Sequence, residues 1–352
     1  MKYYESLSNV ISQENVEKVF KLIDESGQIL ITTHLSPDGD ALGSSLALYN
    51  YLLRKGKRVK IIVPNSYPYF LKWMQGTQKI GVYEYNPRAA QTIIENADLI
   101  FSLDYNIPKR VGEMGVFLEK SSAHKILIDH HLFPGDMFDV IISYPEISST
   151  SELVFRLFYQ ADEYDDMDRI EAECIYCGMM TDTGGFTFNS NSAEIFQIIS
   201  LLLRKGIDKD AIFAKVYNNL SEDRFRLLGF TLLHRMKIYP DLHAALIYLS
   251  KEDQSQFKYN KGDTEGFVNY PLSIEKIVFS AFIREDEGLI KLSFRSHNNF
   301  PSNEFAAEFF GGGGHLNASG GEFYGTLQDS IAHFEKALER YADKLRHEAG
   351  AF

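Results

Sequence analysis

The stretch THLSPDGDALGSSL, residues 33–46, places one histidine and two aspartates within seven residues, ahead of small and apolar residues at helical spacing. His34, Asp38 and Asp40 supply imidazole and carboxylate donors, which divalent cations such as Mn²⁺ take as ligands. Aspartate is also common in turns, and the Pro-Asp-Gly step is a good turn sequence. Taken alone, the stretch is therefore equally compatible with a polar turn and with a cation site.

Three further groups of such residues follow apolar or helical runs. Asp104 closes ADLIFSLD, Asp129, His130 and His131 close HKILIDHH, and Asp182 lies in MMTDTGGF beside two glycines. Ligands bind outside the carboxyl ends of parallel strands, so side chains far apart in the sequence should converge at one edge. Four groups at element ends indicate a metal site rather than coincidence.

The elements that would position these groups alternate between helix and strand patterns over the first 145 residues. Apolar runs at 28–34, 58–64, 97–104, 124–130 and 139–145 predict strands, and 12–26 and 41–56 predict helices. This alternation is typical of a doubly wound, mostly parallel sheet in an α/β protein.

After Pro145 the pattern becomes helical, and strands return further along. Amphipathic helices are expected at 149–161, 170–183, 192–206 and 221–236, then strands at 243–250, 276–285 and 289–296, a glycine-rich loop at 311–321 and a final helix at 327–350. We expect a first domain at 1–217, a helical linker at 218–237 and a smaller mixed α/β domain at 238–352.

The composition limits the partners. With a net charge of −12, the chain does not suit a binder of long nucleic acid or of long duplexes, whose affinity comes largely from neutralised phosphates. A small anionic substrate stays compatible with it. No apolar run reaches 18 residues, so we expect a cytoplasmic protein without a membrane span. The lone CxxC of Cys174 and Cys177 is interpreted as core packing rather than as a metal or redox site.

In this order, the motifs HLSPDGDALGSS, SLDYN, IDHH and MTDTGGF, followed by GGGGH, resemble the DHH phosphoesterase superfamily with its DHH-associated C-terminal domain. The length and the C-terminal motifs look most like its oligoribonuclease (nanoRNase) and phosphoadenosine-phosphate phosphatase group. The resemblance implies that 1–217 is a two-metal catalytic domain and 238–352 a substrate-binding domain. It also implies an active site in the cleft between the two domains.

The resemblance also implies the metal ligands. His34 and Asp38 would bind one divalent cation, Asp40, His130 and Asp182 a second, and Asp104 both. Mn²⁺ is the expected ion, with Mg²⁺ or Co²⁺ as alternatives. A water activated between the ions would attack the phosphorus atom without a covalent intermediate.

The remaining catalytic residues are expected to act through these ligands. Asp129 would orient a ligand histidine, unless it caps a turn, and His131 would lie behind the ligands or touch the scissile phosphate. Gly39 would let the loop fold tightly around the ions. Gly43 would let the following helix begin near the site, where its N-terminus favours a bound phosphate.

The resemblance implies that the substrate is bound by an Arg-Ser pair at the end of a strand and by the glycine loop. In this chain these residues are Arg295, Ser296, Gly313, Gly314 and His315. Consecutive glycine N–H groups can form a nest for an anion, and four in a row would rarely be needed for a turn alone. Arg295 could instead be a surface arginine. Asn303 resembles a family asparagine but would equally serve as a helix N-cap.

The expected activity is hydrolysis of short oligonucleotides, about two to five units long, to 5′-mononucleotides. Removal of the 3′-phosphate of 3′-phosphoadenosine 5′-phosphate is expected beside it. The alternatives are a phosphodiesterase for linear or cyclic dinucleotides, a RecJ-like single-strand exonuclease, and a nucleotide-binding module without activity. A homodimer is expected without direct support from the sequence.

Overall fold

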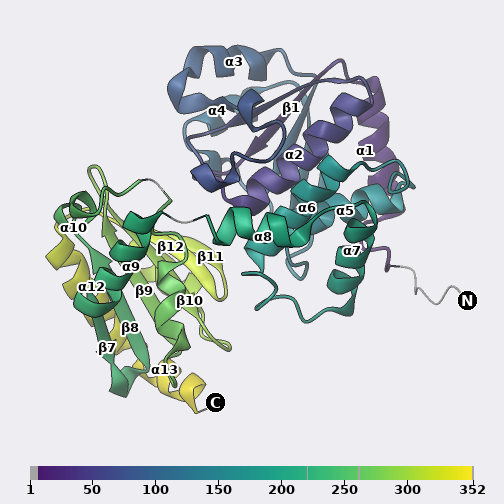
Figure 1. Cartoon of the computed structure of the whole chain (residues 1–352). Coiled ribbons are helices and arrows are strands. Elements are labelled where there is room, and N and C mark those ends of the chain that lie inside the picture. The colour runs from purple at the N-terminus through teal and green to yellow at the C-terminus, as the bar shows by residue number, and fades with distance from the viewer. Residues whose placement is uncertain (1–6, 220, 261, 351–352) are drawn as a thin grey trace, which may run out of the picture. The chain divides into compact units, whose positions relative to one another are not determined.

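The computed structural model describes residues 7–219, 221–260 and 262–350. The chain divides into two compact units, Met1–Asn219 and Leu220–Phe352. Each unit is built on one six-stranded sheet covered by helices, which confirms the expected α/β class (Figure 1). Among the described residues, no helix is long and apolar enough to cross a membrane.

The sheet of the first unit is entirely parallel, with the strand order β3-β2-β1-β4-β5-β6. Its strands are β1 (Gln28–Thr33), β2 (Arg58–Val63), β3 (Gly81–Val82), β4 (Leu99–Leu103), β5 (His124–Asp129) and β6 (Val140–Ser143). The predicted parallel sheet is confirmed, and only the two-residue strand β3 was not expected.

Helices cover both faces of this sheet because successive side chains of a strand point to opposite sides. Ile29 and Ile31 of β1 belong to one buried cluster and Leu30 to another. The first cluster includes side chains from α1 (Gln13–Glu25), α2 (Gly39–Arg54), α5 (Thr150–Gln160), α6 (Arg169–Asp182), α7 (Ala193–Arg204) and α8 (Lys209–Tyr217). The second takes them from α3 (Pro87–Glu95) and α4 (Met114–Lys120), whose ribbons lie together in Figure 1.

The strand order reverses between β1 and β4, which are neighbours in the sheet. From β1 the chain goes on to β2 on one side, and from β4 to β5 on the other. The helices that follow these two strands therefore lie on opposite faces and leave room at the carboxyl ends of the strands, which is where such sheets bind ligands. His34 and Asp104 directly follow β1 and β4.

The second unit contains a mixed sheet with the order β11-β12-β10-β9-β8-β7, in which only β8 and β9 pair in parallel. Phe279, Phe294, Phe305 and Phe334 pack together in its core. Its strands are β7 (Met236–Tyr239), β8 (Ala244–Leu249), β9 (Phe279–Glu285), β10 (Ile290–Ser296), β11 (Gly313–His315) and β12 (Ala318–Phe323), and its helices α9 (Glu222–His234), α10 (Lys251–Gln256), α11 (Ser302–Phe310), α12 (Leu327–Arg340) and α13 (Ala342–Ala349).

Two expectations for the second unit were wrong. The glycine-rich segment 311–321, expected as a loop, contains β11 and most of β12. The helix expected at 327–350 is broken at Tyr341, which leaves helical geometry at φ −101° and ψ 9°. The ring of Tyr341 packs edge-on against Phe305, and its hydroxyl donates to Glu308 at 3.0 Å. Packing of this ring favours the break over one straight helix.

Candidate metal centre

The first group of predicted ligands lies at the end of β1 and the beginning of α2. His34 Nε2 is 3.2 Å from Asp104 Oδ2 and 3.8 Å from Asp38 Oδ1. One donor atom from each of the three residues lies within 4.8 Å of the others. Ligands bound to one cation at about 2.1 Å are separated by roughly 3 Å, so a small inward movement would bring these atoms to a common ion.

The second group joins the ends of α6 and β5 to α2. His130 Nε2 lies 3.4 Å from Asp182 Oδ2 and 3.9 Å from Asp40 Oδ2. The side chains of His130 and Asp40 are almost fully buried, whereas that of Asp182 is 24% exposed. The structure therefore brings together the two sets of side chains that the resemblance assigned to two different cations.

Asp104 lies between the two groups. Its Oδ2 faces His34, and its Oδ1 is 3.5 Å from His130 Nε2. Asp104 also has a positive φ of 62°, an unfavourable conformation for a residue with a Cβ. Strained residues cluster at functional sites, and a carboxylate with one oxygen toward each group has the geometry of a bridging ligand.

Both predicted ligand histidines are anchored through their Nδ1 atoms. Nδ1 of His34 donates to the carbonyl of Leu35 at 2.8 Å, and Nδ1 of His130 to that of Ile147 at 3.1 Å. A proton on Nδ1 leaves the lone pair on Nε2, the atom that faces the carboxylates. Metal-binding histidines are commonly held in this way, so the donor set fits a divalent cation.

Two helix N-termini support the carboxylates. Oδ1 of Asp38 accepts from the backbone N–H groups of Asp40 and Ala41 at 3.0 Å, which makes Asp38 the N-cap of α2. Asp40 accepts from the N–H groups of Thr150 (2.6 Å) and Ser151 (2.8 Å) at the beginning of α5. The N-terminus of α2, expected to favour a phosphate, thus holds a predicted metal ligand instead.

Thr150 is a site residue that the sequence reasoning missed. Besides its N–H contact, its hydroxyl donates to Asp104 Oδ1 at 3.0 Å, and both side chains are buried. The available signal was the segment SSTSE, in which Ser149 and Glu152 have the spacing of a helix N-terminus. A helix N-terminus attracts carboxylates, but the sequence alone does not say which ones.

The pKa directions reflect the crowding of charge. Burial and then repulsion by Asp104 and Asp182 raise the pKa of Asp40 well above its usual value. Burial alone would lower the pKa of His34, but its hydrogen bonds to Asp104 and Asp38 outweigh burial and raise it to about 10. Burial would also lower the pKa of His130, but the nearby carboxylates outweigh burial and raise it to about 9. Positive charge is favoured here, as a cation site requires.

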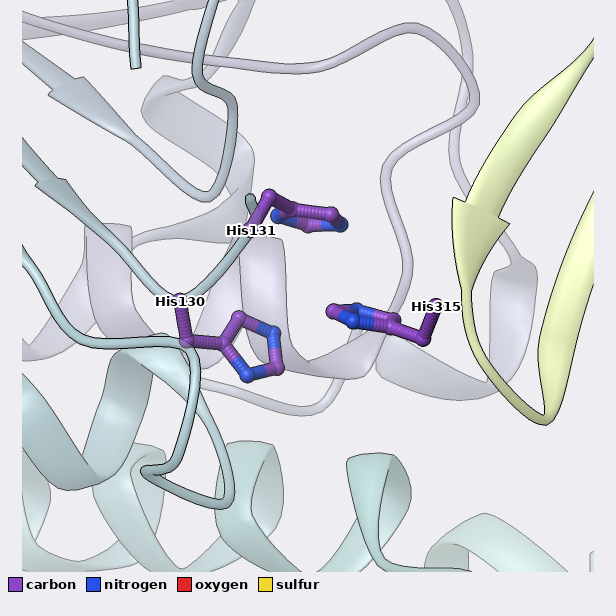
Figure 2. A group of neighbouring side chains, drawn as sticks. All are labelled: His130, His131 and His315. Carbon is purple, nitrogen blue, oxygen red and sulfur yellow. The ribbon is translucent and has the colours of Figure 1, made fainter. Parts of the chain in front are cut away.

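Asp129 orients a different histidine from the expected one. Its Oδ1 accepts from Nδ1 of His131 at 2.7 Å, whereas the predicted ligand His130 is held by a backbone carbonyl. Figure 2 shows the two imidazoles leaving the end of β5, with ring centroids 5.0 Å apart and planes at 72°. Burial and the cation of Arg110 hold the pKa of His131 well below its usual value. Asp129 therefore supports the histidine next to the predicted ligand.

Glycines set the distance between α2 and α6, the helices that carry Asp40 and Asp182. A Cβ on Gly43 would lie 2.6 Å from the carbonyl oxygen of Cys174, and one on Gly39 would lie 2.3 Å from Thr181 Oγ1. Both glycines therefore allow close packing of α2 against α6. Cys174 itself is a buried free thiol on α6, as the packing interpretation of the CxxC requires.

In the second unit, Arg295 and His315 lie on one face of the sheet. Both pair with Ala318 of β12, Arg295 from β10 and His315 from β11, and directly paired residues point to the same side. His315 is also labelled in Figure 2. Ser296 is buried and points to the opposite side, where its hydroxyl donates to the carbonyl of Phe300 at 2.8 Å. The expected Arg-Ser pair therefore does not present both side chains to one ligand.

Most of the glycine run has a structural explanation. Gly311 ends α11 at a positive φ of 58°, and a Cβ on Gly312 would lie 1.9 Å from the carbonyl oxygen of Gly320. Gly314 has a φ of 144°, and a Cβ there would lie 2.4 Å from the carbonyl oxygen of Ala318. Gly313 has neither a positive φ nor a close neighbour, and a Cβ there would meet nothing within 4 Å. Three of the four glycines therefore have a structural explanation in this hairpin, and Gly313 has none.

Asn303 lies in the first turn of α11, whose N-cap position is held by Pro301. The N-cap alternative for Asn303 is therefore wrong. Its Oδ1 atom is buried and has no hydrogen-bond partner among the described residues. An amide oxygen of this kind remains available to a ligand donor.

Comparison with known proteins gives matches over both units. Residues 28–179 match the DHH family N-terminal domain, and residues 242–344 match the DHHA1 domain. The chain is 27% identical to the bifunctional oligoribonuclease and PAP phosphatase NrnA of Thermus thermophilus, over 94% of this chain and 93% of that protein. It is 28% identical to the cyclic-di-AMP phosphodiesterase PdeA of Listeria monocytogenes, over 94% of this chain but only 49% of that protein.

Among solved structures, an exopolyphosphatase-related protein from Bacteroides fragilis superimposes with a TM-score of 0.92 at 54% identity. The match covers 97% of this chain and all of that one. RecJ of Thermus thermophilus, crystallised in complex with Mn²⁺, has a TM-score of 0.56 at 13% identity, over 95% of this chain and 55% of that one. The RecJ likeness concerns the fold alone.

The matched domains, together with the parallel sheet and the donor groups at its edge, define the class of this protein as a metal-dependent phosphoesterase. The chain belongs to the DHH family, and a DHHA1 domain follows its N-terminal domain.

Proposed function

We propose that this protein hydrolyses short oligonucleotides to 5′-mononucleotides and also removes the 3′-phosphate from 3′-phosphoadenosine 5′-phosphate. One observation carries the proposal: two groups of carboxylate and imidazole donors share Asp104, which turns one oxygen toward each. Similarity to NrnA over nearly the whole length of both proteins supports the choice of substrates.

His34, Asp38, Asp40, Asp104, His130 and Asp182 would hold two divalent cations. Mixed imidazole and carboxylate donors favour Mn²⁺, with Mg²⁺ or Co²⁺ as alternatives. When bound, the ions would lower the pKa of a water and neutralise charge on the phosphate. The protein's own contribution is to keep the donors in place, through the backbone carbonyls behind the histidines and the N–H groups behind Asp38 and Asp40.

His131 is proposed to contact the scissile phosphate group or the attacking water. Its Nδ1 proton is directed to Asp129 at 2.7 Å, so its Nε2 atom carries the lone pair and acts as a hydrogen-bond acceptor. The residue therefore suits acceptance of a proton from water better than donation to a phosphate oxygen. Asp129 would hold the ring in the orientation this requires.

The second unit is proposed to bind the rest of the substrate. Arg295 and His315 share one face of the sheet, where a guanidinium and an imidazole suit a terminal phosphate. Gly313 leaves open space where another residue would carry a Cβ, and the buried Oδ1 of Asn303 offers an acceptor. Ser296 is proposed to support this face rather than to contact the substrate, because its hydroxyl and its N–H both bond within the unit.

A cyclic-dinucleotide phosphodiesterase is the second candidate. The match to PdeA spans 94% of this chain and so includes both units, but this chain corresponds to only about half of that protein. The same donor groups would serve either reaction. Substrate comparison is therefore the direct way to separate them.

The test is metal removal, addition of Mn²⁺ and measurement of kcat/KM on a labelled dinucleotide, a 24-mer, 3′-phosphoadenosine 5′-phosphate and a cyclic dinucleotide. We expect the dinucleotide and the bisphosphate to be cleaved and the 24-mer to be resistant. Asp104→Asn should abolish turnover, whereas Asp210→Asn, which changes an exposed carboxylate, should not. Arg295→Ala should raise KM with metal content unchanged. Full activity of Asp104→Asn would refute the proposal.

A further inference from the structure

The loop after β5 exposes an aromatic side chain beside the candidate metal centre. Phe133 follows His131 by two residues, and its side chain is 83% exposed, the highest value among the large hydrophobic residues that the structure describes. Leu132, between them, is 45% exposed. Two residues of extended chain span at most about 7 Å, so the ring lies within reach of a molecule bound at His131.

The backbone of Phe133 is also in an unfavourable conformation. Its φ is 62°, in the left-handed region that bulky residues rarely adopt and that glycine or asparagine would occupy at lower cost. An exposed ring in water brings no burial to offset this cost. Strain of this kind persists only where the surroundings impose it, and it is concentrated at ligand sites.

Asn106 imposes this conformation. Its side-chain Nδ2 donates to the backbone carbonyl of Leu132 and, at 3.4 Å, to that of Phe133. The backbone carbonyl of Asn106 accepts from the N–H of Gly135 at 2.8 Å. Asn106 follows Asp104 by two residues. The loop that presents the ring is thus attached to the segment that carries the predicted bridging ligand.

Resting on the proposed function, we propose that Phe133 stacks against the nucleobase adjacent to the scissile phosphate. A nucleobase is flat and has a π face whatever its identity, so stacking on one phenyl ring would bind nucleotides without selecting the sequence. Because Asn106 already holds the backbone of Phe133, the loop would lose little freedom on binding. Phe133 would therefore distinguish nucleotides from phosphoesters that lack a base.

Product binding tests the inference without turnover. We would measure the affinity of adenosine 5′-monophosphate and of ribose 5-phosphate by calorimetry, with Phe133→Ala and Phe133→Trp. Phe133→Ala should weaken binding of the nucleotide about tenfold relative to the sugar phosphate, and Phe133→Trp should restore it. Phe225→Ala, at a phenylalanine of α9 that is 59% exposed, is the matched control and should leave this ratio unchanged.

Turnover gives the second readout. The ratio of kcat/KM for a dinucleotide to that for the same phosphodiester with both bases removed should fall about tenfold in Phe133→Ala. Thermal unfolding should change little, because the ring is exposed. An unchanged ratio in both assays would overturn the stacking role while the proposed function stood. Absence of cleavage by the wild-type protein would instead overturn the proposed function, and the binding assay would still test the ring.

Discussion

Replacement of Thr150 by valine tests whether the N-terminus of α5 positions the metal ligands. The substitution keeps shape and backbone, so the N–H of residue 150 still donates to Asp40. It removes only the hydroxyl that donates to Asp104 Oδ1 at 3.0 Å, in a site where both side chains are buried.

The size of the effect follows from this single contact. A hydrogen bond to a charged group contributes about 1.5–3 kcal/mol, and 1.4 kcal/mol corresponds to about tenfold in an equilibrium constant. Without the hydroxyl, Asp104 would no longer be held between the two donor groups. We therefore expect Mn²⁺ affinity to fall about ten- to hundredfold, the range seen when residues behind metal ligands are changed.

The assay is a titration of the metal-free protein with Mn²⁺, in which binding is measured by calorimetry or by electron paramagnetic resonance. Thr231→Val is the matched control, since Thr231 is equally buried but its hydroxyl donates only to the carbonyl of Leu227 in its own helix. The control should keep the wild-type affinity. If Thr150→Val also kept it to within about threefold, the positioning role would be refuted.

Two further predictions concern packing and protons. A Cβ on Gly178 would lie 1.9 Å from Ser151 Oγ, so Gly178→Ala should lower the free energy of unfolding by about 1–3 kcal/mol in denaturant titration. Gly229→Ala, in a helix with open space around the glycine, should instead raise it, and equal effects would contradict the packing argument. The pKa of His34, raised to about 10, means that the metal-free protein gains stability below the ordinary value of 6.5 and loses it as pH rises through about 10. Since a cation needs the neutral imidazole, Mn²⁺ affinity should rise with pH over this interval with release of protons, and pH-independent binding would contradict it.

Strand patterns in the sequence predicted the first unit well because its strands are continuous apolar runs buried on both faces. Leu99–Leu103 is an example, since all five of its residues are buried. The hairpin of β11 and β12 could not be predicted in this way. Its glycines have low strand propensity, and the hairpin forms because Gly312 and Gly314 allow the close approach of backbone in β12.

The candidate site likewise has features that the sequence predicted and features that it did not. A polar residue directly after a buried parallel strand must lie at the ligand-binding edge, so the positions of His34 and Asp104 followed from the sequence. The hydrogen-bond partner of Asp129 did not follow from the sequence, because neighbouring histidines at a strand end point in different directions. Only the turn after β5 places Nδ1 of His131, rather than that of His130, at this carboxylate.

The sequence by itself determined the parallel sheet, the membership of the DHH family and the donor residues that converge at the sheet edge. Tertiary structure alone decided how these donors are held. Thr150 reaches Asp104 from a helix that begins 46 residues later in the chain. Gly39 and Gly43 set the distance between α2 and α6, and Gly178 sets that between α6 and α5. Such contacts depend on distances of tenths of an ångström between distant segments, and no local pattern of residue types encodes them.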